Sequence, residues 1–254
     1  MFFRKAVTPD ADPRDVEEGR MPFLAHLGEL RQRIIVCLIA LVLGFALTFS
    51  FSERIITYLA RPLEPVKLAF LEPTEPFWVN MKVALVTGGF VVLPVLLWQV
   101  WGFIAPGLLP HERKFALPFV ILSTLSFFAG ASFAITVIVP KAIHFLISFK
   151  TGNLVPTLSV NRYVDFILKF TVAFGLIFEL PLALTLGSRL GLVTPAFLAK
   201  NRKYAILLCF VASAILTPTP DAFNQLLMAG PMILLYELGI VAARVFGRRK
   251  RAVA

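Results

Sequence analysis

Two glutamates with cationic and apolar neighbours are the residues of this chain whose chemistry stands out. Glu29 lies in the segment HLGELRQR, which begins at His26 and precedes the first long apolar stretch. Glu112 follows a loop rich in proline and glycine, between the second and third apolar stretches. A carboxylate accepts two parallel hydrogen bonds from the planar fork of an arginine, so both glutamates are candidate contacts for a cationic ligand.

Each glutamate also has a purely structural interpretation. Glu29 and Arg33 are four residues apart, and on a helix they would form a surface ion pair worth about 0.3 kcal/mol. Glu112 would favour the dipole of a helix that starts directly after it. The two residues by themselves support the binding and the structural interpretations equally.

The composition places these glutamates in a membrane protein. Hydrophobic residues make up 58% of the chain and charged residues only 16%, which is unlike a soluble domain of this length. Segments close to the ~20 apolar residues that cross a bilayer as a helix lie at 34–51, 78–103, 115–139 and 163–188. Two shorter apolar runs follow at 204–216 and 226–236, and polar residues at their ends could lengthen both helices. We therefore expect an all-α, polytopic membrane protein with six transmembrane helices.

The distribution of lysine and arginine predicts the orientation of these helices. Short segments rich in these residues stay on the cytoplasmic side of a membrane. With both termini inside, most of the cations fall on the inner side, among them Arg113, Lys203 and the run Arg248–Arg251. The net charge of +10 then follows from topology, because no basic stretch carries the interleaved aromatic residues of a nucleic-acid-binding surface. We expect a multi-pass protein of the cytoplasmic membrane, with both termini cytoplasmic and no bound nucleic acid.

The chain divides into a flexible cytoplasmic tail at 1–20, a membrane domain at 21–245 and a basic cytoplasmic tail at 246–254. Apolar residues of the segment 23–30 recur at helical spacing, which predicts an amphipathic helix on the inner membrane surface before the first span. Four prolines interrupt the outer connection at 52–77, so we expect short pieces that form a periplasmic cap together with the connection at 140–162.

Glu179 is an acidic residue deep inside the fourth span. At 1.5 Å per residue it lies ~13 Å from the inner end of that helix, close to the middle of a ~30 Å core. Burying its charge costs on the order of 3 kcal/mol, and Lys169 is ~15 Å away along the same helix, too far to pair with it. Protonation, a water-lined cavity or a partner on another helix must offset this cost. The purely structural interpretation of Glu179 is a protonated glutamate that forms a hydrogen bond in the core. Pro181 predicts a bend beside the carboxyl group.

The sequence shows no pattern typical of enzymatic chemistry. Cys37 and Cys209 lie in apolar spans without a histidine or carboxylate at ligand spacing, which indicates neither a metal site nor a disulfide. No Walker-type glycine-rich loop and no Ser/His/Asp arrangement is found. We expect no enzyme, no cofactor and no metal.

Several motifs together resemble the TatC family, the receptor subunits of the twin-arginine protein translocase. They are F-x-x-H-L-x-E-L-R-x-R at 23–33, TEPF at 74–77, WQVWGFIAPGL at 98–108 leading to HER at 111–113, FELP at 178–181, and LTPTPD at 216–221 with Gln225. They extend from residue 23 to about 240 in the order of the family, which makes the match specific where any single motif would be weak. The tail before Arg20 lies outside the resemblance.

The resemblance implies a signal-peptide receptor that recognises consecutive arginines on proteins exported in the folded state. Glu112 would be the principal contact. Glu29, Leu30 and Arg31 would complete a cytoplasmic recognition patch. An arginine pair would be preferred to a lysine pair, because lysine cannot reproduce the two-point contact with a carboxylate.

The resemblance also implies partners. The single-span subunits TatA and TatB would bind along the fifth and sixth spans, where Thr217 and Gln225 are the polar candidates, within an oligomeric complex surrounded by membrane lipid. Glu179 would face the concave side of the bundle. Because no nucleotide motif is present, the proton-motive force is the implied energy source, with Glu179 as a candidate proton acceptor. The short fifth and sixth spans indicate local thinning of the bilayer.

Two functions of other classes are alternatives. A proton-coupled secondary transporter of a small solute would use Glu179 as its proton site, although no internal repeat supports such a fold. A structural membrane scaffold without a ligand would tolerate replacement of both inner glutamates.

Overall fold

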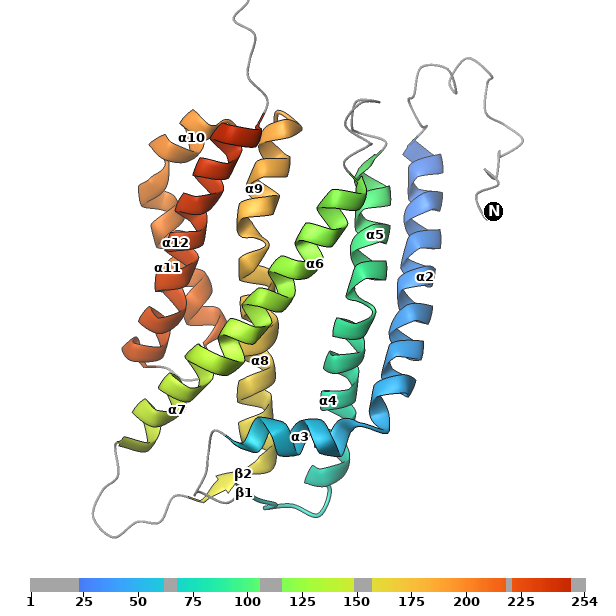
Figure 1. Ribbon diagram of the computed structural model, residues 1–254, viewed down its shortest axis with the longest axis vertical. Helices are drawn as coiled ribbons and strands as arrows, with labels where there is room; N and C mark the ends of the chain where they lie inside the picture. Colours follow the sequence, from blue (N-terminus) through green and yellow to red (C-terminus); the bar gives the residue numbers. More distant parts are fainter. Residues whose placement is uncertain (1–22, 62–67, 106–115, 149–156, 218–220, 248–254) are drawn as a thin grey trace, which may run out of the picture.

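Helices form nearly all of the described protein (Figure 1). The computed structural model describes residues 23–61, 68–105, 116–148, 157–217 and 221–247. The helices are α2 (Phe23–Phe49), α3 (Ser52–Ala60), α4 (Glu75–Val91), α5 (Leu93–Ile104), α6 (Ala116–Phe133), α7 (Val139–Ser148), α8 (Val160–Phe178), α9 (Leu180–Arg189), α10 (Pro195–Lys200), α11 (Arg202–Leu216) and α12 (Ala222–Phe246). A π-helical turn (Ala134–Ile138) joins α6 to α7, and β1 (Leu68–Ala69) and β2 (Leu158–Ser159) are two-residue strands. The predicted tails lie outside these ranges, apart from Phe246 and Gly247.

The helix α8 is the centre of the bundle. It packs against α4 and along α6, and it also touches α12. Its residues Phe170 and Phe174 are fully buried. Further out, α2 packs on α4 and α5, while α12 packs on α9 and α11. Figure 1 shows that α2 begins and α12 ends at the same end of the bundle, which we call the open end.

By length and hydropathy, four helical stretches of the described chain can cross a membrane. They are His26–Phe49, Ala116–Ser148, Val160–Arg189 and Ala222–Phe246. The pair α4 and α5 passes the same test only when taken together, and it is bent by 57° between Val91 and Leu93. Pro94 is in the first turn of α5, so the bend falls where a proline removes a backbone donor. The protein is therefore a multi-pass helical membrane protein.

The prediction of a separate surface helix before the first span is wrong. The segment 23–33 and the first apolar stretch form one continuous helix of 27 residues, α2. No proline interrupts it, and Gly28, the weak helix former in this segment, is tolerated within a long helix. The polar end of α2 is thus an extension of the membrane helix.

The third helical stretch continues beyond its predicted end at Val139. It passes through Pro140 and reaches Ser148, so it occupies part of the predicted outer connection. The π-helical turn directly before Pro140 explains this continuation. A proline ring clashes with the carbonyl four residues earlier in an α-helix, and a wider turn relieves that clash.

The last two helices differ in length. The helix α12 has 25 residues and contains Pro231, so it extends well beyond the short apolar run at 226–236. Polar residues such as Gln225 and Glu237 are accommodated within α12, which extends it beyond the apolar run. The helix α11 has 15 residues, or ~22 Å of helix, and is as short as its apolar run indicates.

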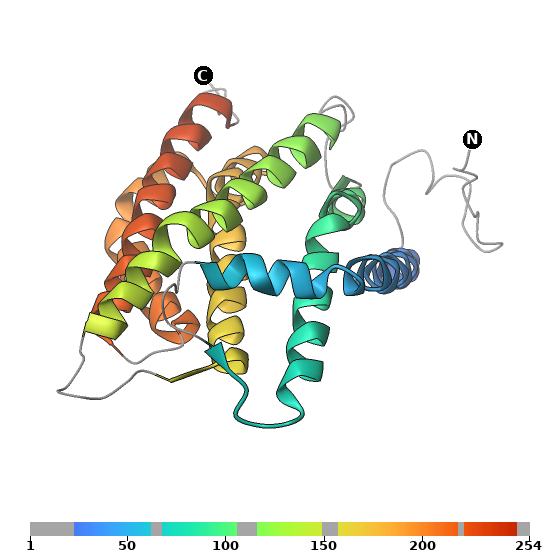
Figure 2. The ribbon, with the colours of Figure 1, turned by 60° about the horizontal axis from the view of Figure 1, so that its bottom comes forward.

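Short elements lie at the end of the bundle opposite the open end. We call this the capped end. The helix α3 lies across it (Figure 2), and β1 pairs in parallel with β2. The buried carboxylate of Glu75 fixes the connection, because it accepts hydrogen bonds from the backbone N–H of Leu71 at 3.0 Å and from the hydroxyl of Ser159 at 2.9 Å. The hydroxyl of Tyr163 donates to the carbonyl of Leu59 at 2.7 Å, which ties α3 to α8.

Candidate functional site

The described residues of the predicted recognition patch lie at the open end of the bundle, on the first turns of α2. Arg33 donates to the carboxylate of Glu29 from Nε at 3.1 Å and also from Nη2. The same guanidinium reaches α5, where its Nη1 lies 3.3 Å from Oε1 of Gln99 and 3.5 Å from the Gln99 carbonyl oxygen. The surface ion pair that the spacing predicts is therefore present, and its arginine also ties α2 to α5.

The carboxylate of Glu29 retains capacity for another donor. Both hydrogen bonds from Arg33 go to Oε1, whereas Oε2 is buried and accepts no hydrogen bond from the described residues. The nearest cationic candidate for Oε2 is Nδ1 of His26, at 3.8 Å, beyond hydrogen-bonding distance. The His26 ring is instead held by stacking on Phe103, with ring centroids 4.3 Å apart. Glu29 is thus an oriented carboxylate with one unused oxygen.

Gly102 makes room for this arrangement. A Cβ atom at that position would lie 2.0 Å from Nη1 of Arg33. Any side chain there would displace the guanidinium and weaken its contacts with Glu29 and Gln99. The glycine in the WGF part of the motif therefore has a packing role that the sequence alone did not indicate.

Of the other predicted members of the patch, the structure describes Leu30 and Arg31 but not Glu112. Arg31 is exposed and Leu30 is half-buried on the same turns of α2. Glu112 lies outside the described residues, together with its neighbours His111 and Arg113. The helix α5 ends at Ile104, close to the stacked ring of Phe103, so the chain leaves the described part of the structure beside Glu29.

An apolar cavity opens at the same end of the bundle. Its volume is about 390 Å³, and it lies between α5, α6, α9 and α12. Trp101, Phe119, Leu122 and Leu182 are among the residues that line it. Arg189 stands at its rim and donates from Nε to the carbonyl of Phe246 at 2.9 Å.

Glu179 lies at the junction of α8 and α9. The helix breaks at this residue, two positions before Pro181, as the sequence predicts. Its Oε1 is buried and has no hydrogen-bond partner among the described residues. The polar neighbour that faces the carboxyl is Ser123 of α6, whose hydroxyl is likewise buried without a well-placed partner. Lys169 does not reach the carboxyl group of Glu179. A cationic partner that would offset the cost of burying the Glu179 charge is therefore not found among the described residues.

Thr217 and Gln225 lie at the connection between α11 and α12. Thr217 is buried, and its hydroxyl donates to the carbonyl of Ser213 at 2.6 Å. The side-chain amide nitrogen of Gln225 donates to the backbone carbonyl of Phe210 at 3.2 Å. The backbone carbonyl of Gln225 accepts a hydrogen bond from the Ser213 hydroxyl at 2.6 Å. Their described hydrogen bonds thus join the two helices, and the side-chain oxygen of Gln225 is left without a donor in the described chain.

Sequence reasoning missed an ion pair inside the bundle. Lys82 of α4 lies 2.7 Å and 2.9 Å from the two carboxylate oxygens of Asp165 on α8, and 2.9 Å from Oδ1 of Asn161. The position of Lys82 near the outer end of its helix alone predicts a side chain that extends toward the membrane interface. A search for a counter-charge to each intramembrane lysine would have found Asp165, because such charges are usually paired.

The described residues offer no centre for a metal. Nowhere in these ranges do three or more His, Cys, Asp or Glu side chains gather in a way that could hold an ion. The chemistry available at the open end is hydrogen bonding and charge pairing around Glu29, beside an apolar cavity.

Comparisons with known proteins agree on one family. Residues 25–231 match the family model described as "Sec-independent protein translocase protein (TatC)". The chain is 43% identical over 239 residues to a protein of that name from Desulforapulum autotrophicum, covering 92% of this chain and 88% of the relative. It is 39% identical to the one from Aquifex aeolicus, covering 92% of this chain and 99% of the relative.

Its fold is similar to that of a solved structure, a crystal structure of the "Twin Arginine Translocase Receptor- TatC". The TM-score is 0.79 at 40% sequence identity, and the similarity covers 88% of this chain and 100% of the solved chain.

Proposed function

This chain belongs to the TatC family and is a component of the Sec-independent protein translocase, and we propose that it is the subunit that binds twin-arginine signal peptides. The observation that carries the proposal is the similarity over nearly its whole length to a solved structure described as the twin-arginine translocase receptor. These matches favour a translocase component over a solute transporter.

The proposed binding surface is the patch of Glu29, Leu30, Arg31 and Glu112. The Glu29 side chain supports this proposal, because it is partly exposed at the open end and both of its hydrogen bonds from Arg33 go to the same oxygen, Oε1. Arg33 already offsets part of the Glu29 charge, so Glu112 is the principal contact in this proposal. Charge-assisted hydrogen bonds contribute about 1.5–3 kcal/mol each, and therefore replacing two arginines of a signal by lysines lowers affinity roughly ten-fold or more.

The apolar part of the signal enters the cavity at the open end. Trp101, Phe119 and Leu182 give it an apolar lining close to the patch, so one peptide reaches both surfaces with its charged and apolar parts. After binding, TatA and TatB type subunits associate with α11 and α12. The exposed apolar side chains of Leu207, Leu208 and Ile215 provide a lipid-facing surface for single-span helices, and the free amide oxygen of Gln225 can accept from them.

The proposed topology places the open end in the cytoplasm. Both described chain ends, Phe23 and Gly247, lie there (Figure 1), and the two predicted cytoplasmic tails adjoin them in the sequence. Six crossings result when the bent pair of α4 and α5 and the short α11 are counted with the four longer stretches. The capped end then faces the periplasm. The energy for export comes from the proton-motive force, and Glu179 is the residue proposed to exchange a proton.

The test is binding of a twin-arginine signal peptide and its twin-lysine variant to the detergent-purified protein. We expect the arginine peptide to bind at least about ten-fold more tightly, and Glu112→Ala and Glu29→Ala to remove most of that preference. Glu53→Ala is the matched control, since Glu53 is exposed on α3 at the capped end. Equal binding of the two peptides to the unmodified protein would contradict the proposed function.

A further inference from the structure

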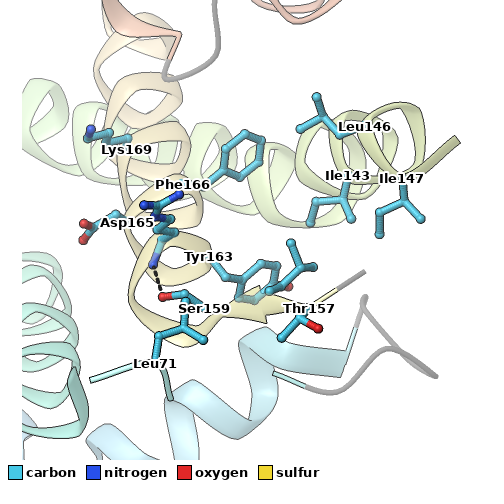
Figure 3. A pocket seen from close by; sticks show the side chains of 12 residues that line it. Leu71, Ile143, Leu146, Ile147, Thr157, Ser159, Tyr163, Asp165, Phe166 and Lys169 are labelled. Atoms are coloured by element: carbon cyan, nitrogen blue, oxygen red, sulfur yellow. Dashed lines mark hydrogen bonds between the residues drawn. The ribbon is translucent and has the colours of Figure 1, made fainter. Parts of the chain in front are cut away.

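A second cavity lies far from the recognition patch, at the capped end of the bundle. Its volume is about 540 Å³, within the range of small-molecule sites, and it lies between α7, α8 and the β1–β2 pair (Figure 3). No step of the proposed export mechanism uses it. Its lining combines charged side chains of α8 with apolar side chains of α7.

Two cations of this cavity have no counter-charge among the described residues. Arg162 and Lys169 are seven residues apart on α8, which places them on one face of the helix and ~10 Å apart along its axis. Both are exposed, and neither forms an ion pair within the described residues. Asp165 is the acidic residue of the lining, and its two oxygens are held by Lys82 at 2.7 Å and 2.9 Å. The lining therefore has an excess of positive charge.

Apolar side chains continue this charged face. Phe166 follows Arg162 by one turn of α8 and points toward α7, whereas Lys169 and Asp165 project from the other flank of that helix (Figure 3). Across the cavity, Ile143, Leu146 and Ile147 of α7 form the opposite wall (Figure 3). A small inorganic anion would leave this wall without a partner. An amphiphile with an anionic head and a hydrocarbon tail matches both parts.

The depth of the cavity agrees with a lipid ligand. It begins beside Ser159, at the start of α8, and extends to Lys169, ~14 Å further along the helix. The candidate span Val160–Arg189 begins at this point, so the cavity lies at the end of a membrane helix, where lysine and arginine direct their charged ends toward the headgroups. Basic pockets between membrane helices bind anionic lipid headgroups by this combination of charge and burial.

We propose that the cavity between α7 and α8 binds an anionic phospholipid of the leaflet at the capped end. Arg162 and Lys169 hold the phosphate of its headgroup, and an acyl chain lies along Phe166 and Leu146. The lipid thereby joins α7 to the central helix, beside the Lys82–Asp165 pair that joins the central helix to α4.

The test measures lipid binding to delipidated protein in a non-ionic detergent by native mass spectrometry. Phosphatidylglycerol, phosphatidylcholine and inorganic phosphate are added separately at matched concentrations. We expect phosphatidylglycerol to bind in preference to phosphatidylcholine. The double variant Arg162→Gln/Lys169→Gln should bind phosphatidylglycerol at least about ten-fold more weakly than the unmodified protein. The swap Arg162→Lys/Lys169→Arg keeps both charges and should retain binding, which separates loss of charge from loss of fold.

A matched control removes the same charge from the same end of the bundle. Arg54 of α3 and Lys141 of α7 are exposed and do not line the cavity, so Arg54→Gln/Lys141→Gln should bind phosphatidylglycerol like the unmodified protein. Equal losses in the two double variants would show general electrostatic attraction and overturn the proposal. Equal binding of the two lipids, or displacement of phosphatidylglycerol by inorganic phosphate, would overturn it as well.

Discussion

Gly88 and Gly44 lie where α4 and α2 approach each other most closely, and replacing Gly88 by alanine tests that contact. A Cβ atom at Gly88 would lie 2.6 Å from the backbone nitrogen of Phe45 and 2.7 Å from the carbonyl carbon of Gly44. Ordinary contact begins at 3.4 Å, so the two backbones would have to separate locally by about 0.8 Å. Backbone atoms of a helix cannot swing aside as a long side chain can.

The expected cost follows from this overlap. Overpacking of a well-packed interface typically costs about 1–3 kcal/mol, and we expect Gly88→Ala to destabilise the protein by that amount. Separation of the helices would also stretch the hydrogen bond from the Thr48 hydroxyl to the Ala84 carbonyl, which is 2.7 Å long. The better helix propensity of alanine offsets at most about 1 kcal/mol.

Thermal unfolding of the purified protein in detergent measures the effect. Gly230→Ala in α12 is the control, because a Cβ atom there has no neighbour within 4 Å. It should leave the melting temperature unchanged or raise it slightly, whereas Gly88→Ala should lower it. Similar melting temperatures for the two variants would refute the reasoning from the close approach of α2 and α4.

Other contacts give predictions that the same unfolding measurement checks. Lys82→Gln should cost about 1 kcal/mol or less, because its pair with Asp165 is more than a third exposed, and the charge swap Lys82→Asp/Asp165→Lys should recover most of the loss. Glu179→Met should raise stability by about 1 kcal/mol, since it removes a buried oxygen without a partner, while protein export is lost; a lower melting temperature would show that the carboxyl is satisfied. Ser213→Ala should cost about 1 kcal/mol by removing the hydrogen bond to the Gln225 carbonyl, and an unchanged melting temperature would contradict that bond.

The membrane class and most of the helices were predictable because hydropathy is a local property. Apolar runs long enough to cross a bilayer marked the spans, and Pro181 marked the break at the end of α8, whereas the break before Pro94 inside the span predicted at 78–103 was missed. The predictions went wrong at element ends. Pro140 does not end its helix, because the π-helical turn before it accommodates the ring.

The candidate site was predictable only in part. The type and spacing of Glu29 and Arg33 indicated their ion pair, but not that Arg33 also reaches Gln99, 66 residues away in sequence. The unused oxygen of Glu29 and the role of Gly102 depend on how α5 lies against α2. The positions of Glu112 and its neighbours stay a prediction, since they lie outside the described residues.

The sequence by itself determined that this chain is a helical membrane protein and which of its charged residues stand in apolar surroundings. Helix formation and membrane insertion depend on residues close together in the chain, so local sequence patterns predict both. The tertiary structure decided which charges meet, as Lys82 meets Asp165, and which have no counter-charge among the described residues, as is the case for Arg162 and Lys169. Those outcomes depend on the rotation and register of helices distant in sequence, which are set by packing contacts such as those of Gly44 and Gly88.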